Sequence, residues 1–161
     1  MTDPAELLFT RDEVAANLGA ALAEFISRDH HLLAVNAGEV AWNGPLSAHV
    51  REHFPGWIVS TEYDRNGYEA KALRDLCGDG DVAIRPDIIV HQYGPEGPNL
   101  LAVELKKASN TNRAHDICKL KAMTLPRKDG GLGYAWGALV VLGLHKPKPI
   151  RWFAGGEEVE Q

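Results

Sequence analysis

Three charged residues at the borders of two short apolar runs carry the clearest chemical signal in the sequence. Asp87 precedes the run Ile-Ile-Val at 88–90, and Glu104 and Lys106 follow the run Leu-Leu-Ala-Val at 100–103. Two carboxylates held close together repel each other unless a cation lies between them. Carboxylate oxygens and waters are ligands that Mg²⁺ accepts, and a lysine beside the metal can orient or deprotonate a bound water. These residue types predict metal-assisted hydrolysis of a phosphodiester.

The two apolar runs are expected to form a β-hairpin, because a turn-rich segment of glycine and proline at 94–99 separates them. In the simplest register, Asp87 lies opposite Lys106 and Ile89 lies opposite Glu104. Side chains alternate between the faces of a strand, so all three charged side chains then share one face. The two carboxyl groups lie on a diagonal of about 7–8 Å, and a slip of one residue would separate them onto opposite faces.

The order of the predicted elements defines the fold class. Asp12 is the expected N-cap of a helix with a stripe of apolar residues. A proline in the first turn marks a second helix from Asn43. The predicted elements are helices at 13–27, 43–54 and 113–125, and strands at 57–63, 86–93, 99–106, 136–144 and 150–153. We therefore expect a single α/β domain with a mixed central β-sheet flanked by helices. Residues 1–42 form a helical extension on a core at 43–153, and 154–161 form an acidic tail.

Composition is consistent with one globular domain. The 161 residues are 45% hydrophobic and 24% charged, which suffices for a hydrophobic core. No apolar stretch approaches the roughly 20 residues of a membrane helix, and the first residues lack the order of a secretory signal. Cys77 and Cys118 stand far apart outside any dense cysteine pattern, so we expect them to be reduced, in a cytoplasmic protein.

Basic residues concentrate in the last third of the chain. Residues 1–100 carry 7 basic and 16 acidic side chains, whereas residues 101–152 carry 10 basic and 3 acidic ones. This asymmetry indicates a side that faces a polyanion, although the net charge is −5. An ordinary solvated face is the alternative. Lys107, Arg113 and Lys119 are the candidates for contacts with nucleic-acid phosphates.

The Pro-Asp pair at 86–87 and the Glu-Leu-Lys triplet at 104–106 resemble the PD-(D/E)xK nuclease superfamily, whose members share the restriction-endonuclease-like fold with an αβββαβ core. The resemblance implies a metal-dependent nuclease acting on nucleic acid, with DNA favoured over RNA. It implies that Asp87, Glu104 and the backbone carbonyl of Leu105 bind Mg²⁺ or Mn²⁺. It also implies that Lys106 positions the attacking water.

The resemblance, which covers about residues 43–153, is incomplete at one position. Many members bring a further glutamate from the first core helix to the metal. The helix predicted here contains only Glu52, near its far end; Glu39 before it and Glu62 in the next strand are other candidates. This departure leaves open a catalytically inactive module that binds nucleic acid or a protein partner. A homodimer that cuts both strands is a further expectation.

His49 and His53 belong to the segment His-Val-Arg-Glu-His, which fits the H-x-x-E-H pattern of inverted zinc peptidases. The spacing places both histidines on one face of a helix and suits zinc. The helix is expected to end directly afterwards at Phe54, however, and those peptidases are much larger enzymes. We therefore expect surface histidines or histidines that contact a partner.

Overall fold

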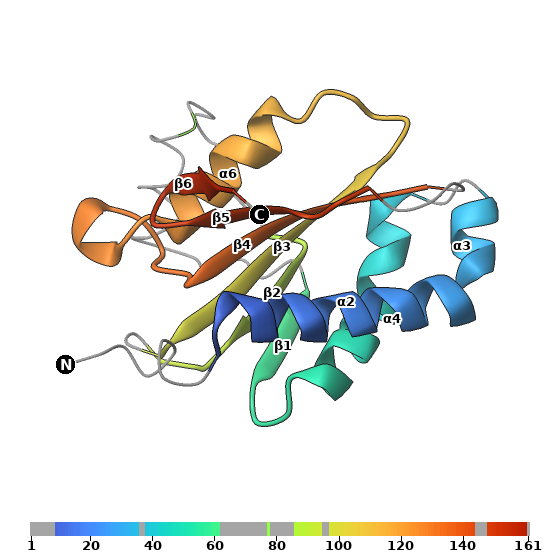
Figure 1. Ribbon diagram of the computed structural model, residues 1–161, viewed down its shortest axis with the longest axis horizontal. Coiled ribbons are helices and arrows are strands. Elements are labelled where there is room, and N and C mark those ends of the chain that lie inside the picture. Colours follow the sequence, from blue (N-terminus) through green and yellow to red (C-terminus); the bar gives the residue numbers. More distant parts are fainter. Residues whose placement is uncertain are drawn as a thin grey trace.

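A computed structural model of the protein describes residues 9–35, 38–61, 77, 86–94, 97–143 and 148–160. In this part of the chain, six strands form one sheet in the order β1-β2-β3-β4-β5-β6 (Figure 1). The elements are α2 (Arg11–Arg28), α3 (His30–Ala34), α4 (Glu39–His53), β1 (Ile58–Thr61), β2 (Ile88–His91), β3 (Asn99–Lys107), α6 (Ala114–Thr124), the 3₁₀ turn η1 (Arg127–Asp129), β4 (Trp136–Leu142), β5 (Arg151–Ala154) and β6 (Glu157–Val159). The predicted single-domain α/β class with a mixed sheet is confirmed.

Strand β3 is the centre of the sheet. It pairs antiparallel with β2 and parallel with β4, and its first seven residues are buried. Parallel neighbours need a crossover connection, which α6 provides between β3 and β4. Among the elements of the described residues, the order from α4 to β4 is therefore helix, three strands, helix, strand.

Two hydrophobic cores lie on opposite faces of the sheet. Leu101, Val103 and Leu105 of β3 point into a core with α2 and α4. Ala102 points into a second core, which includes Leu120 of α6. Figure 1 shows α2 and α4 on one side of the sheet and α6 on the other. Because side chains alternate between the two faces of a strand, successive residues of β3 pack in turn against α2 and α4 on one face and against α6 on the other.

The hairpin of β2 and β3 forms as predicted, but its register differs by two residues. Ile89 pairs with Ala102 rather than with Glu104, and His91 pairs with Asn99 after an irregularity in β2. Strand β2 therefore ends at His91, earlier than expected, and β3 begins at Asn99. Because a shift of two residues preserves the faces of both strands, the predicted shared face of the carboxylates survives the wrong register.

Two helices begin earlier than predicted. Thr10, not Asp12, caps α2, and its side chain and that of Glu13 form a reciprocal capping box. Helix α4 begins at Glu39 instead of Asn43, with the proline inside the helix. The predicted start relied on the preference of proline for a first turn, which tertiary packing overrides here. The extra turn brings a glutamate to the positive end of the helix dipole.

The expectation of reduced cysteines is wrong in this structure. Cys77 and Cys118 form a disulfide across a sequence separation of 41 residues, with their Cα atoms 5.8 Å apart. The partner of a cysteine so distant in sequence depends on how α6 packs, which spacing alone does not reveal. Among the described residues, none of the helices has the length and apolar character needed to cross a membrane.

Helix α6 packs tightly over β4 at Gly137, and this contact generates a stability prediction. A Cβ atom there would lie 3.1 Å from Thr124 Cγ2, 3.2 Å from Leu120 Cδ2 and 3.3 Å from Phe153 Cβ. All three neighbours are buried and have little room to move. We expect Gly137→Ala to lower the free energy of unfolding by about 1–3 kcal/mol in urea denaturation.

Gly19→Ala in α2 is the matched control. A Cβ at Gly19 meets nothing within 4 Å, so this variant should match the wild type or exceed it by up to about 1 kcal/mol. Equal stability of Gly137→Ala and wild type would contradict the close packing of α6 on β4.

Candidate active site

The two predicted metal-binding carboxylates meet where the start of β2 lies beside the second half of β3. Asp87 directly precedes β2, and its Oδ2 accepts a hydrogen bond of 2.7 Å from the backbone N–H of Leu105. Glu104 is the preceding residue of β3 and is 1% exposed. Continuing the observed register by one residue places Asp87 opposite Glu104, where cross-strand Cβ atoms lie about 4.5–5.5 Å apart.

Burial and mutual repulsion both act on these carboxylates. Burial raises the pKa of Glu104 well above its ordinary value, and the charge of Asp87 raises it further against the lowering effect of Lys119. Burial also raises the pKa of Asp87, and hydrogen bonding to the Leu105 N–H and to the Glu104 carboxyl group only partly offsets this effect. Both shifts favour the protonated acids over the charged ones, and a cation bound between the carboxylates would favour the charged forms instead.

Two lysines and a third carboxylate complete the cluster. Lys106 Nζ lies 2.7 Å from Asp116 Oδ2. Lys119 Nζ lies 3.0 Å from Glu104 Oε2 and 3.5 Å from Asp116 Oδ1. Burial lowers the pKa of Lys119, but the neighbouring carboxylates outweigh that effect and raise it. Asp116 thus contacts the ammonium groups of both lysines, and Lys119 connects it to Glu104.

One oxygen of the acid pair remains available. Glu104 Oε1 is buried and has no hydrogen-bond partner among the described residues. An unpaired buried carboxylate oxygen costs about 1–3 kcal/mol or more. Such an oxygen is a suitable ligand for a hard divalent cation, which would compensate that cost.

The first core helix does supply a glutamate close to this site. Glu39, the first residue of α4, accepts a hydrogen bond of 2.9 Å at Oε1 from the backbone N–H of Lys107. Glu52 lies 13 residues further along the same helix, a rise of about 20 Å, and the structure does not bring it to the acid pair. Glu62, the other candidate, lies outside the described residues.

The three candidates for phosphate contacts separate in the structure. The Nε and Nη2 atoms of Arg113 are buried without a hydrogen-bond partner in the described part of the chain, at the N-terminus of α6. Lys107 is half-buried at the end of β3. Lys119 points into the acid cluster instead of toward solvent. Arg113 is therefore the candidate whose unpaired donors best suit a phosphate.

Sequence reasoning missed the part that Asp116 plays. Its carboxylate connects the strand lysine to the helix lysine, and it is 6% exposed. The available signal was the spacing of Asp116 and Lys119, three residues apart on one helix face.

Comparisons of the chain with family models, curated proteins and solved structures gave no match.

The raised pKa of Glu104 generates a prediction about pH. The folded chain retains this proton at pH values where the unfolded chain has lost it, so this group lowers stability as pH rises above the ordinary glutamate pKa. We expect the stability of Glu104→Gln relative to wild type to increase between about pH 4 and pH 8. Urea denaturation without divalent metal measures this difference.

Glu158→Gln provides a control of opposite sign. The hydrogen bond from Arg151 lowers the pKa of Glu158, so its contribution is present at neutral pH and disappears on acidification. The relative stability of this variant should fall slightly as pH rises, because the pair is exposed. A Glu104→Gln difference that does not change with pH would contradict the burial and repulsion assigned to Glu104.

Proposed function

We propose that this chain is a metal-dependent nuclease that hydrolyses phosphodiester bonds of nucleic acid, with DNA as the favoured substrate. The observation that carries the proposal is the meeting of Asp87 and Glu104 as a buried acid pair with one unpaired oxygen. Lys119 and Asp116 connect this pair to the ammonium group of Lys106. The order of elements from α4 to β4 agrees with the αβββαβ core of the superfamily that these residues resemble.

The donor set fits Mg²⁺ or Mn²⁺. Asp87 and Glu104 offer carboxylate oxygens, and the Leu105 N–H that holds Asp87 fixes the edge of β3 toward it. In an extended strand the carbonyl of a residue points to the same edge as its N–H, which suits the proposed role of the Leu105 carbonyl as a ligand. A bound Mg²⁺ would stabilise charge on the phosphate and lower the pKa of the attacking water.

The remaining residues orient the water and the nucleic acid. Asp116 holds the Lys106 ammonium at 2.7 Å, so Lys106 can donate hydrogen bonds to a water at a fixed position. Lys119 balances the charge of Glu104. Arg113 and Lys107 are proposed to contact phosphates beside the site, and Glu39 to hold the end of β3 through the N–H of Lys107.

A second candidate function rests on the ion pairs themselves. Asp116 and Glu104 already satisfy Lys106 and Lys119 within the chain, and such internal neutralisation also suits an inactive module on the same fold. This module would bind nucleic acid or a protein partner without divalent metal. Calorimetry separates the two candidates, because only the nuclease requires Mg²⁺ or Mn²⁺ binding that Asp87→Ala abolishes.

A cytoplasmic location and a homodimer that cuts both strands are further parts of the nuclease proposal. A disulfide such as that between Cys77 and Cys118 is rare in reducing compartments and speaks against this location.

A cleavage assay tests the nuclease proposal. Plasmid, single-stranded DNA and RNA are incubated with wild type in Mg²⁺, Mn²⁺ or EDTA. We expect metal-dependent cleavage that falls by about 10²–10⁴-fold in Lys106→Ala, because the attacking water loses its orienting group. Glu104→Ala should retain the native circular-dichroism spectrum and lose cleavage.

Lys128→Ala is the matched control, since Lys128 is an exposed lysine in η1. It should cleave at the rate of wild type. Full cleavage by Glu104→Ala would refute the assignment. A wild type that neither binds metal nor cleaves any of the three substrates would favour the binding module.

A further inference from the structure

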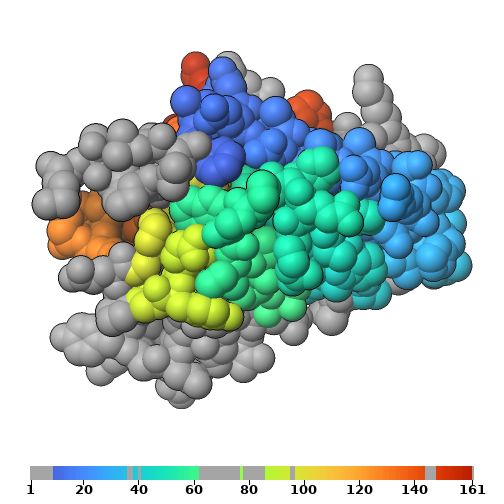
Figure 2. Space-filling model, turned by 90° about the horizontal axis from the view of Figure 1, so that it is seen from below, coloured from blue at the N-terminus to red at the C-terminus, as the bar shows by residue number. Residues whose placement is uncertain are grey.

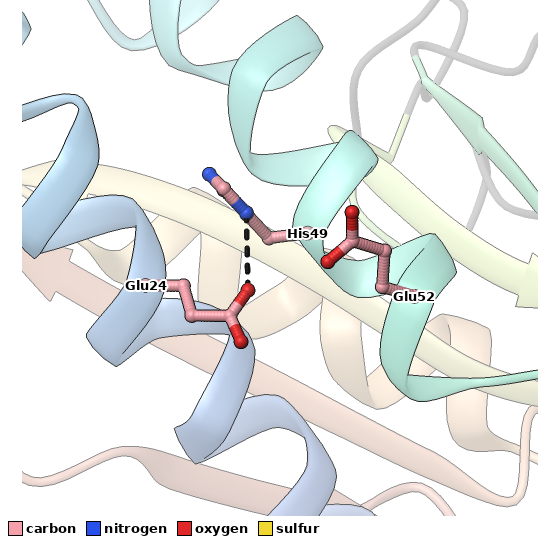
Figure 3. Close-up of side chains that lie close together, drawn as sticks. All are labelled: Glu24, His49 and Glu52. Atoms are coloured by element: carbon pink, nitrogen blue, oxygen red, sulfur yellow. Dashed lines mark ion pairs between the residues drawn. The ribbon is translucent and has the colours of Figure 1, made fainter.

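A second group of metal-binding side chains lies between α2 and α4, across the sheet from the candidate active site. Glu24 comes from α2, and His49 and Glu52 come from α4 (Figure 3). One ligand atom from each residue lies within 4.8 Å of the other two. Figure 2 shows the face on which these helices, coloured blue and blue-green, lie side by side.

Hydrogen bonds from outside the trio fix two of its side chains. His49 Nε2 lies 2.9 Å from Asp29 Oδ2, so an Nε2–H there donates to that carboxylate. His53 Nε2 lies 3.0 Å from Glu24 Oε1 and donates to it in the same way. Asp29 thus occupies His49 Nε2 and leaves His49 Nδ1 directed into the trio. His53 occupies Glu24 Oε1 and leaves Glu24 Oε2 directed into the trio.

These two inward atoms do not satisfy each other as neutral groups. His49 Nδ1 and Glu24 Oε2 are 3.3 Å apart, and Glu24 Oε2 is buried without a hydrogen-bond partner among the described residues. If Asp29 accepts the only ring proton, the Nδ1 lone pair faces a carboxylate lone pair. A cation between them removes this conflict, and the alternative is a second proton on His49.

We propose that Glu24, His49 and Glu52 bind a first-row transition-metal ion, with Zn²⁺ as the representative, and thereby tie α2 to α4. The imidazole nitrogen favours such an ion over Mg²⁺ or Ca²⁺. Three protein ligands with a fourth position for water are a common zinc arrangement. The hydrogen bonds from Asp29 and His53 are the outer contacts that orient metal ligands in proteins.

This arrangement revises the expectation drawn from the His-Val-Arg-Glu-His segment. His49 is a buried residue with a side chain only 11% exposed, not a surface histidine. His53 contacts Glu24 rather than completing a two-histidine ligand pair. The decisive ligand, Glu24, comes from a different helix, so the site differs from that of the zinc peptidases.

Zinc titration of the metal-stripped full chain by calorimetry tests the proposal. The Glu104→Gln background is used because it removes one carboxylate of the acid pair and so weakens metal binding there, and zinc binding between α2 and α4 should persist in it. We expect His49→Gln to weaken zinc binding at least 100-fold and Asp29→Asn to weaken it about 10–100-fold. Zinc should also raise the melting temperature of the Glu104→Gln chain, the parent of the other variants, but not that of the chain that also carries His49→Gln. His115→Gln, which changes an exposed histidine of α6, should bind as the parent does.

Glu52→Gln provides a second variant, because Glu52 is exposed and an exposed side chain can be replaced with little effect on folding. Loss of zinc affinity in this variant supports the site even if His49→Gln fails to fold. Absence of zinc binding in the parent, or unchanged affinity in Glu52→Gln and His49→Gln, would overturn the proposal and identify the cluster as an ion pair with a protonated His49. Nuclease activity has no part in this readout, so failure of either proposal leaves the other intact.

Discussion

The structure depends on the burial of both faces of β3 at the centre of the sheet. Because side chains alternate along this strand, Val103 and Leu105 must enter the core under α2 and α4, and Glu104 must enter the layer under α6. A carboxylate at that position cannot be solvated by bulk water. The residues around it, Lys119 above all, are arranged in response to this one buried charge.

The charge cluster under α6 is poorly explained as a device for stability. Buried ion pairs often contribute little net stabilisation, since desolvation offsets their attraction. Here the pKa values of Asp87 and Glu104 are both raised, which shows that the folded chain resists their ionisation. Perturbed acids that converge with a lysine on one strand edge are typical of functional sites.

Helix α4 connects the two clusters across the molecule. Its first residue, Glu39, contacts the end of β3 near Lys106, and its last turns place His49 and Glu52 against α2. The start of this helix therefore determines more than a boundary. A helix beginning at Asn43, as predicted, would have left the end of β3 without its glutamate contact.

The sequence by itself determined what local pattern encodes. Strand alternation placed Asp87 and Glu104 on one face even in the wrong register, since that property survives a shift of two residues. Tertiary structure decided the register itself, the first turn of α4, the disulfide, the bridging role of Asp116 and the approach of Glu24 to His49. Each of these depends on contacts between segments far apart in sequence, or on packing that outweighs a local preference, and neither leaves a periodic signal along the chain.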